Sequence, residues 1–315
     1  MRKTAIIGAG QVGSAIAYTL ALSGLAGEIT LIDTNENRAR GEATDISHGM
    51  PLCPPVKITG GGYGLLEGAE LVIMTAGANQ KPGEDRRSLA GRNIDIMDSV
   101  SRQLRARCPE CILLTVTNPV DTVTRAAIQM TGFPPRRVFG SGTTLDTLRM
   151  RAMLAEHTKL DPRNIHGFVL GEHGDSEFAA WSSVSISGMT MSEYCRDCGQ
   201  CDWQLPSRME AAFDADVRKA AYKVIEMKGS TNYAIAMAVR RIVQAVIRDE
   251  KSILTVSSLL TGQYGINDVC LSLPCVIGKR GVERVIPIKL TADEELSLRH
   301  SADMIRSVCS APQYI

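Results

Sequence analysis

Residues 4–13 of the chain read TAIIGAGQVG, and this stretch decides the fold. Residues 4–7 are a short apolar run typical of a buried strand, and the glycine-rich residues after them lead into a segment with helical periodicity. Gly8, Gly10 and Gly13 match the pattern G-x-G-x-x-G, whose glycines permit a tight turn, close approach of the backbone to a pyrophosphate, and close helix–strand packing. The stretch therefore predicts the strand, turn and helix that open a dinucleotide-binding fold.

Asp33 strengthens this interpretation, because it lies twenty residues after Gly13 at the end of a second apolar run, residues 29–32. A carboxylate at this place can accept hydrogen bonds from the ribose of a dinucleotide, and it repels the 2′-phosphate of NADP. The alternative is a glycine-rich turn with Asp33 as an ordinary residue at the end of a strand. The matching order of strand, turn, helix and carboxylate favours an NAD site.

The rest of the chain continues as an α/β pattern. Further short apolar runs lie at residues 71–74, 112–116 and 138–139. Continuous apolar runs suit parallel strands that are covered on both faces. We predict a Rossmann-type parallel sheet domain at residues 1–140 and a second, mixed α/β substrate domain at residues 141–315. Three long helical patterns are expected to form the core of the second domain, at residues 207–228, 231–248 and 298–309.

The bulk composition is that of an ordinary soluble protein. Of the 315 residues 44% are hydrophobic and 22% charged, and 35 basic against 34 acidic side chains leave a net charge of +1. No Lys/Arg run stands out, which argues against nucleic acid as a partner. Arg2 and Lys3 at the start of the chain, with the uncharged stretch after them, resemble a signal peptide, but glycines interrupt the apolar run early. We therefore expect a cytoplasmic protein without membrane contact.

The nine cysteines are an odd number in a long chain, which favours reduced thiols in a cytosolic setting and no disulfides. Cys195, Cys198 and Cys201 form C-x-x-C-x-x-C, a spacing that can bind metal. Because no fourth ligand is evident, a reduced surface loop is favoured over a zinc site, and no metal is expected.

Hydride transfer between NAD and a hydroxy acid needs a proton carrier, a cation for the carboxylate and a group that polarises the carbonyl. His173 follows the apolar run 168–170, so it is expected at the exit of a strand, although a lone histidine is as often structural. Asp146 and Arg149 are three residues apart in a helical pattern and therefore share one helix face. Arg149 could bind a carboxylate through two hydrogen bonds, while Asp146 could favour the protonated imidazole. Spacing alone favours the alternative, a surface ion pair of little energetic weight.

Five segments, read together, resemble the L-lactate/malate dehydrogenase family. They are GAGQVG at 8–13, TAGANQKPGEDR at 75–86, TNPVD at 117–121, GSGTTLD at 140–146 and GEHGDSE at 171–177. The resemblance implies an NAD-dependent oxidoreductase of glycolysis and fermentation that acts on a small 2-hydroxy acid as a homo-oligomer, a dimer or tetramer. A non-catalytic dinucleotide-binding protein with this fold is the alternative of another class. Such a protein is expected to lack at least one of four residues that are all present here, His173, Asp146, Arg86 and Arg149.

The resemblance also implies a role for each residue that matches a motif. His173 would be the proton donor and acceptor, Asp146 would orient it, and Arg149 would bind the substrate carboxylate. Arg86 would lie on a mobile loop that closes over the substrate and polarises its carbonyl, and Asn118 would contact the substrate oxygen. Reduction of the keto acid is then expected to weaken as pH rises through the pKa of His173.

Two further residues would line the pocket: Thr231 would contact the substrate, and Ile235 would lie near the nicotinamide. The other positions that match on the cofactor side are Gly8, Gly10, Val12, Gly13, Asp33, Arg38, Tyr63, Gly77, Ala78, Ser99, Val116 and Asn118. Arg38, Tyr63 and Ser99 carry the weakest signal, because each could equally be a surface or packing residue.

Gln80 decides between lactate and malate, because malate enzymes that resemble this loop carry arginine there. A second carboxylate enclosed against a neutral glutamine would be an unpaired, desolvated charge costing on the order of 2–5 kcal/mol. Pyruvate and lactate are therefore expected, with malate or a bulkier 2-hydroxy acid as alternatives. Arg87 could supply the missing cation if it turned inward, but its place beside Arg86 favours a solvent-facing side chain.

Arg151 lies two residues beyond Arg149, about 200° around a helix, so it must serve something else. The resemblance implies that Arg151 and His166 bind a phosphate of fructose 1,6-bisphosphate across a subunit interface in activated members of the family. An ordinary interface or surface pair is the equal alternative. The chain begins directly at its first strand, so we also expect a dimer–tetramer equilibrium that such a ligand shifts.

Overall fold

The computed structural model describes residues 3–78, 86–198 and 206–309 of the chain. Six parallel strands form one half of the main sheet, in the order β3-β2-β1-β4-β5-β6. They are β1 (Lys3–Ile7), β2 (Glu28–Ile32), β3 (Lys57–Gly61), β4 (Leu71–Met74), β5 (Ile112–Thr115) and β6 (Val138–Gly140). This order is that of a doubly wound dinucleotide-binding sheet, and it confirms the predicted fold class.

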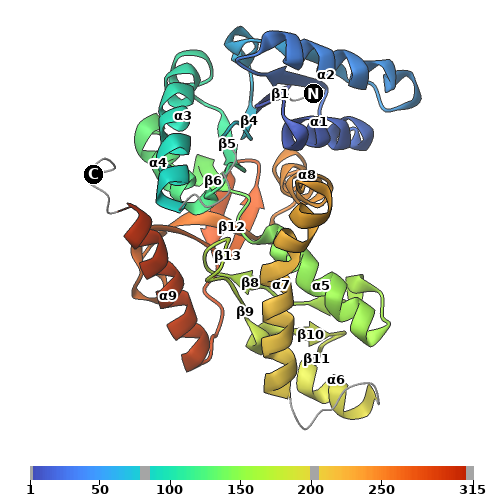
Figure 1. Cartoon of the computed structure of the whole chain (residues 1–315), viewed down its shortest axis with the longest axis vertical. Helices are drawn as coiled ribbons and strands as arrows, with labels where there is room; N and C mark the ends of the chain where they lie inside the picture. Colours follow the sequence, from blue (N-terminus) through green and yellow to red (C-terminus); the bar gives the residue numbers. More distant parts are fainter. Residues whose placement is uncertain (1–2, 79–85, 199–205, 310–315) are drawn as a thin grey trace.

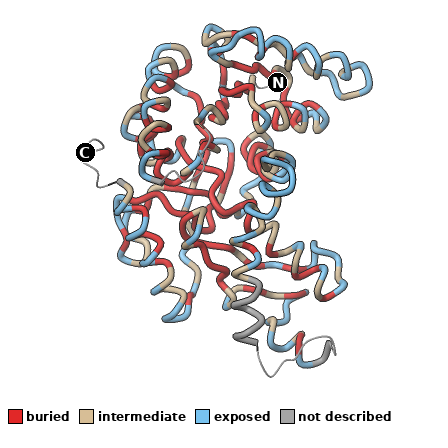
Figure 2. The backbone as a smooth tube through the Cα atoms, viewed as in Figure 1, coloured by how far each residue is buried: buried red, intermediate tan, exposed pale blue. Residues whose placement is uncertain are grey.

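Helices cover both faces of this parallel sheet (Figure 1). They are α1 (Gln11–Ser23), α2 (Glu36–His48), α3 (Arg86–Arg107), α4 (Val120–Thr131) and α8 (Tyr233–Ile247). Successive residues of β1 serve opposite faces: Ile6 packs in a core with Leu20 of α1, and Ile7 packs in another with Met97 of α3. The burial of the strands between these two layers explains their continuous apolar runs (Figure 2).

Three antiparallel strands from the second half of the chain extend the same sheet. They are β12 (Ser252–Thr261), β13 (Asn267–Gly278) and β14 (Gly281–Val285). Ser257 of β12 pairs with Gly140 of β6, so one sheet of nine strands runs past the predicted boundary between residues 140 and 141. The division into two domains stays a prediction.

The other elements of the second half surround its own cores. The helices are α5 (Thr144–Thr158), α6 (Met191–Cys198), α7 (Pro206–Lys228) and α9 (Ala292–Cys309). The short strands are β7 (Ile165–His166), β8 (Val169–Leu170), β9 (Phe178–Ala179), β10 (Ser185–Ile186) and β11 (Met189–Thr190). Short 3-10 helices lie at Met50–Leu52, Tyr63–Leu66, Pro135–Arg137, Pro162–Asn164, Trp181–Ser183 and Gln263–Gly265.

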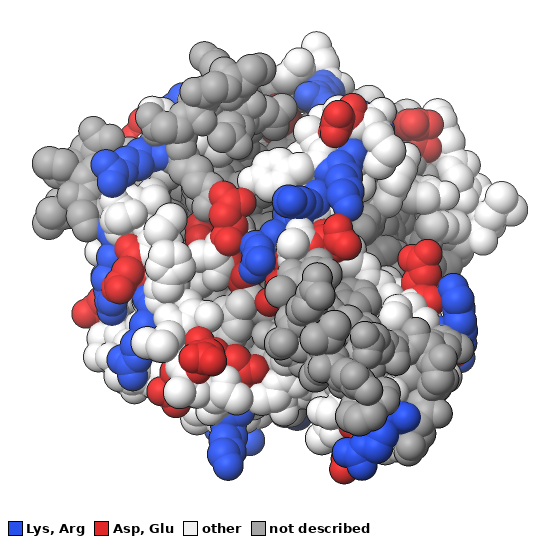
Figure 3. Space-filling model, turned by 60° about the horizontal axis from the view of Figure 1, so that its bottom comes forward, with Lys and Arg blue, Asp and Glu red and all other residues white. Residues whose placement is uncertain are grey.

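The helices and the surface charges of the structure relate to the expected location and partners of the protein. Within the described segments, no helix combines the length and the apolar character needed to cross a membrane. On the face shown in Figure 3, basic and acidic side chains are interspersed rather than gathered by sign. The absence of a nucleic-acid partner stays a prediction.

Candidate functional site

The glycine-rich turn between β1 and α1 leaves no room for a side chain at two of its glycines. A Cβ on Gly8, which has φ +104°, would lie 2.6 Å from the backbone nitrogen of Ala76. A Cβ on Gly13 would lie 1.8 Å from the carbonyl oxygen of Gly8, because α1 packs directly on the turn. Both positions therefore require glycine to maintain the geometry of the turn.

Gly10 differs from these two glycines, because a Cβ there would meet no described atom within 4 Å. Gly10 is also the N-cap of α1, and no side chain of the described residues caps this helix. The turn thus presents open space beside backbone N–H groups at a helix N-terminus, which is what a pyrophosphate requires. This geometry fits NAD.

Asp33 lies beside the turn, at the end of β2. Its Oδ2 accepts a hydrogen bond from the N–H of Ala9 at 2.8 Å, and its Oδ1 accepts one from the N–H of Asn35 at 2.9 Å. Burial, and then the negative charge of Asp33, raise the pKa of the Tyr63 hydroxyl. The structure therefore places two of the predicted cofactor residues close to each other, whereas Arg38 is an exposed residue of α2.

Other predicted cofactor positions lie along the same edge of the sheet. Val12, Val116 and Ile235 are partly buried against one apolar core, although they come from α1, the end of β5 and α8. Gly77 and Ala78 follow β4. Ser99 of α3 is exposed, and no interaction that we describe connects it to these residues.

Asn93 of α3 joins the ends of two strands, and sequence reasoning did not identify it. Its Oδ1 accepts a hydrogen bond from the N–H of Ala78 at 2.7 Å, and its Nδ2 donates to the carbonyl of Asn118 at 2.7 Å. The available signal was a polar residue in the buried stripe of a helix, at helical spacing from Ala90 and Met97. The next peptide bond, Asn118–Pro119, is cis, and the Asn118 side chain is exposed, as a contact with substrate would require.

Two threonines hold α5 against β8 and so bring Asp146 to His173. Thr143 Oγ1 donates to the carbonyl of Val169 at 2.5 Å, and Thr147 Oγ1 accepts from the N–H of the same residue at 3.0 Å. His173 follows three residues after the end of β8, at the strand exit that the sequence predicts. The first turn of α5, which carries Asp146, therefore faces the loop that carries the imidazole.

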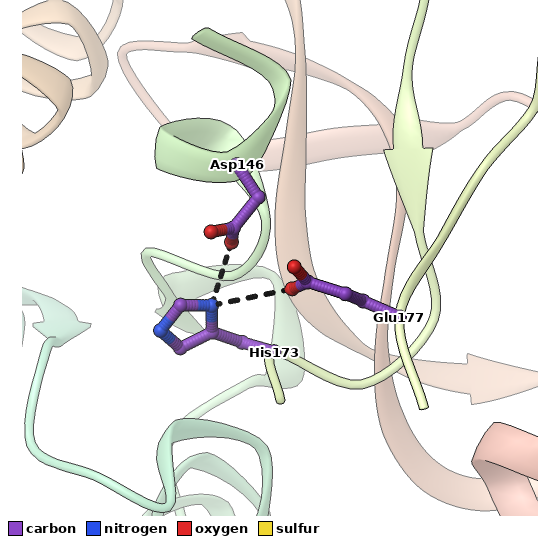
Figure 4. Close-up of side chains that lie close together, drawn as sticks. All are labelled: Asp146, His173 and Glu177. Atoms are coloured by element: carbon purple, nitrogen blue, oxygen red, sulfur yellow. Dashed lines mark hydrogen bonds and ion pairs between the residues drawn. The ribbon is translucent and has the colours of Figure 1, made fainter. Parts of the chain in front are cut away.

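Asp146 binds two groups with its two oxygens. Its Oδ2 lies 2.6 Å from Nδ1 of His173 (Figure 4), and its Oδ1 accepts a hydrogen bond from Nη1 of Arg149 at 2.7 Å. The Asp146 side chain is only 1% exposed, against 15% for Arg149 and 22% for His173. The predicted alternative of a surface ion pair is therefore wrong, because the shared carboxylate is buried and joins both residues into one site.

This arrangement fixes the chemical state of the imidazole. Burial by itself disfavours the imidazolium, but the charge and the hydrogen bond of Asp146 are the main causes that outweigh burial and raise the pKa of His173 to about 9. Burial likewise opposes ionisation of Asp146, but His173 and Arg149 hold the pKa of that carboxyl below its ordinary value. Because Nδ1 binds Asp146, Nε2 is the nitrogen left to exchange a proton with a substrate.

Asp121 is a second residue that sequence reasoning missed, although it lies in the quoted TNPVD segment. It is buried in the first turn of α4, where its Oδ2 accepts from the N–H of His173 at 2.8 Å. Its Oδ1 accepts from the hydroxyl of Ser257 at 2.6 Å. Burial raises the pKa of Asp121 to about 6 despite these hydrogen bonds. Asp121 thus ties the His173 loop to the first half of the chain.

Glu177 is the third such residue, and it lies in the quoted GEHGDSE segment. Its carboxyl is buried, with Oε2 3.8 Å from Nδ1 of His173. Potential ligand atoms of Asp146, His173 and Glu177 all lie within 4.8 Å of one another. Arg149 already forms an ion pair with Asp146, so hydrogen bonds and opposite charges explain why these three side chains lie together. The expected absence of a metal stays a prediction.

Several predicted residues fall outside the described part of the chain. Gln80 and Cys201 lie in undescribed segments, and the side chains of Arg86 and Cys198 are also undescribed, although these residues begin α3 and end α6. Arg87 is described and exposed, which agrees with the expected solvent-facing role.

The remaining predicted residues lie in the second half. Thr231 lies just before α8 and next to Ser230, whose hydroxyl donates to Gln11 Oε1 in the glycine-rich turn. Arg151 donates to the carbonyl of Pro162 at 2.9 Å. His166 on β7 is exposed, whereas Cys195 is a buried residue of α6, so the expectation of a surface loop is wrong at this cysteine. The roles of these residues stay predictions.

Both halves of the chain match models of one family. Residues 2–140 match the lactate/malate dehydrogenase NAD binding domain, and residues 143–311 match the lactate/malate dehydrogenase alpha/beta C-terminal domain. Together these two matches span nearly the whole chain.

Individual proteins agree with these matches. The L-lactate dehydrogenase of Acetivibrio thermocellus is 48% identical over 308 residues, covering 98% of this chain and 96% of the relative. That of Thermoanaerobacterium saccharolyticum is 49% identical over 309 residues, covering 98% of each. Among solved structures, a lactate dehydrogenase from a Medee basin deep-sea metagenome library has a TM-score of 0.93 at 36% identity, covering 98% of both chains. The minor L-lactate dehydrogenase of Enterococcus mundtii has a TM-score of 0.92 at 38% identity, covering 98% of this chain and 97% of that one.

Proposed function

Because the chain belongs to the lactate/malate dehydrogenase family, we propose that it is an NAD-dependent L-lactate dehydrogenase, which interconverts L-lactate and pyruvate. The observation that carries the proposal is the cluster in which buried Asp146 holds both His173 and Arg149. It combines a proton carrier and a cation for the carboxylate, two of the three groups that a reaction on a 2-hydroxy acid needs beside a nicotinamide.

Each residue of the cluster has a distinct part in this reaction. NAD, when bound, accepts the hydride from the alcohol or supplies it to the ketone. His173 takes the hydroxyl proton at Nε2 during oxidation and gives it back during reduction. Asp146 keeps Nδ1–H oriented and stabilises the imidazolium. Arg149 binds the substrate carboxylate.

Residues from the neighbouring loops complete the proposed pocket. Asn118, held at its carbonyl by Asn93, contacts the substrate oxygen from the end of β5. Arg86 polarises the carbonyl, and Thr231 lines the pocket. Around the cofactor, the turn at Gly10 receives the pyrophosphate, with the N–H groups of α1 beside it.

Gln80 selects pyruvate over oxaloacetate in this proposal, because it offers no charge to a second carboxylate. The exposed side chain of Arg87 supports this assignment, since Arg87 is the neighbouring cation that could otherwise meet that carboxylate. Malate dehydrogenation, the alternative within the family, has no described residue in its favour.

Oxidation of NADH with pyruvate or oxaloacetate tests the proposal, in the wild type and in Gln80→Arg. Pyruvate should be the better substrate of the wild type by about 100-fold or more in kcat/KM, and Gln80→Arg should shift the preference toward oxaloacetate. Arg87→Gln is the matched control, because it removes a neighbouring charge and should leave the preference unchanged. A wild type that prefers oxaloacetate would contradict the assignment.

The proposal extends to assembly, regulation and location. Large apolar side chains exposed on α1 and α8 support a homo-oligomer, a dimer or tetramer: Tyr18, Leu22, Tyr233 and Met237. Arg151 and His166 are the proposed contacts of a fructose 1,6-bisphosphate effector in a cytoplasmic enzyme of glycolysis and fermentation. Light scattering with and without the bisphosphate, together with the KM for pyruvate, tests the effector. An unchanged mass and an unchanged KM would contradict it.

A further inference from the structure

Glu177 lies directly behind the proposed proton carrier, and its backbone is fixed on both sides. It precedes β9, and its N–H donates to the carbonyl of Gly174 at 3.2 Å. Its own carbonyl accepts a hydrogen bond from Nη1 of Arg218 on α7 at 3.0 Å. The side chain is only 4% exposed, so the carboxyl group has a defined place in the interior.

The carboxyl group of Glu177 faces the same ring nitrogen as Asp146. Figure 4 shows both side chains directed at Nδ1 of His173, Asp146 at 2.6 Å and Glu177 Oε2 at 3.8 Å. Only Asp146 is close enough for a hydrogen bond. Oε2 of Glu177 is buried and has no hydrogen-bond partner among the residues that the structure describes.

The surrounding charges decide which of the two carboxyls is ionised. Asp146 receives bonds from His173 and from Arg149, and both stabilise its negative charge. Burial, followed by the negative charge of Asp146, raises the pKa of Glu177 well above its ordinary value, although His173 and Arg149 oppose this. Asp121, on the α4 side of the imidazole, is a further acidic group. An ionised Glu177 would be a second buried negative charge beside Asp146, and its Oε2 lies 3.8 Å from Nδ1 of His173, too far for a hydrogen bond.

We propose that Glu177 is a positioning residue for His173 and acts as a neutral carboxylic acid. Its uncharged polar head fills the second place beside Nδ1, so the ring cannot turn away from Asp146 and Asp146 remains the one ionised carboxyl at that nitrogen. The catalytic part of this inference rests on the proposed function, whereas the charge of Glu177 does not.

Two variants separate the charge of Glu177 from its shape. Glu177→Gln keeps a neutral polar head, and Glu177→Leu keeps most of the volume without one. Asp175→Asn is the matched control, because it removes an exposed carboxylate from the same loop. In the wild type this carboxylate accepts a hydrogen bond from the hydroxyl of Tyr222. The pKa of His173 is measured by NMR on protein with ¹⁵N-labelled histidine, with the resonance assigned from a His173→Gln sample. Values of kcat and KM with pyruvate are measured in parallel.

In Glu177→Gln, the pKa of His173 should equal that of the wild type, and kcat should stay within about twofold. Glu177→Leu should lower kcat by about tenfold or more with little change in the KM for NADH, because the ring is less well held. A pKa of His173 that falls by about one unit or more in Glu177→Gln would mean that Glu177 is ionised, and would overturn the inference. Equal kcat in the Gln and Leu variants would overturn it as well, because Glu177 would then only fill space.

The two measurements keep this inference separate from the proposed function. If the wild type fails to reduce pyruvate, the proposed function fails, but the NMR titration still determines the charge of Glu177. If Glu177→Leu does not fold, the titration of Glu177→Gln still tests whether the neutral acid is the native state.

Discussion

Asp146 uses each of its oxygens for a different cation, and the pH dependence of the enzyme should follow from this. Burial lowers the pKa of His173, but mainly the charge and the hydrogen bond of Asp146 outweigh burial and raise this pKa from the ordinary 6.5 to about 9, so the imidazolium that reduction needs persists up to that pH. The value of kcat/KM for pyruvate should therefore be level below about pH 9 and fall above it, whereas lactate oxidation should rise with pH.

Asp146→Asn removes the charge but keeps the size of the side chain. Without the carboxylate the imidazolium is less stable, so the fall in pyruvate reduction should move to lower pH and the maximal rate should drop. Profiles of kcat/KM against pH for both proteins check this. A break at the same pH in the variant would show that Asp146 does not set the proton affinity of His173.

Asp121→Ala should destabilise the protein, because it leaves the N–H of His173 and the hydroxyl of Ser257 without their acceptor. An unpaired buried group costs about 1–3 kcal/mol, which urea denaturation can resolve. Asp216→Ala, at an exposed ion pair on α7, is the matched control and should change the free energy of unfolding by less than about 1 kcal/mol. Equal effects of the two substitutions would contradict a structural role for Asp121.

At the scale of elements, the turn between β1 and α1 permits a test of cofactor binding apart from folding. Gly10→Ala adds a Cβ into open space at a φ of −80°, so the fold and Tm should be kept while the affinity for NADH falls by about tenfold or more. Gly13→Ala places a Cβ 1.8 Å from the carbonyl of Gly8, so both Tm and NADH affinity should fall. Thermal melts and NADH fluorescence titrations distinguish the two. Undiminished binding in Gly10→Ala would show that no phosphate lies against that glycine.

The same elements show what could be predicted from sequence. The strands that lie between two helix layers were found because burial on both faces gives uninterrupted apolar runs, as in residues 71–74. β3 was missed, because this edge strand is only partly buried and ends in two glycines. α9 was found only from residue 298 onward, because its first turns are acidic and exposed in part. β12 and β13 were missed as well, although most residues of β13 are buried, so local pattern reports burial only in part.

The residues of the site also differ in how far sequence pattern could predict them. Asp146 and Arg149 could be paired from spacing within one helix, but whether the pair is buried depends on β8, which packs against it through Thr143 and Thr147. Asp121 and Glu177 had no periodic signal that pointed to the site, and the helical spacing that places Asn93 in a buried stripe did not indicate which strand ends it joins. Each of them acts through a contact between segments that are far apart in the sequence, or through two carboxyl groups that lie beside one imidazole. Such contacts form only in the folded chain and leave no mark in the local sequence pattern.

At the scale of the whole molecule, the two predicted domains share both a sheet and a core. β12 pairs with β6, and α8 contributes Val239, Ile242 and Val243 to the core that includes Ile16 and Leu20 of α1. Removing residues 141–315 would therefore expose one edge of the parallel sheet and an apolar face of the first core. Each fully buried large apolar side chain contributes roughly 1.5–3 kcal/mol, so the loss of several exceeds the usual margin of stability.

A fragment of residues 1–140 should consequently fail to fold as an independent unit, even though it contains the complete NAD-binding turn. It should bind a dye for exposed apolar surface, lack a cooperative unfolding transition and bind NADH weakly, whereas the full chain should unfold cooperatively. Far-UV circular dichroism during denaturation, with NADH titration of both proteins, makes the comparison. A fragment that unfolds cooperatively and binds NADH like the full chain would instead establish residues 1–140 as an autonomous domain, and the shared core would then be a docking contact rather than a condition for folding.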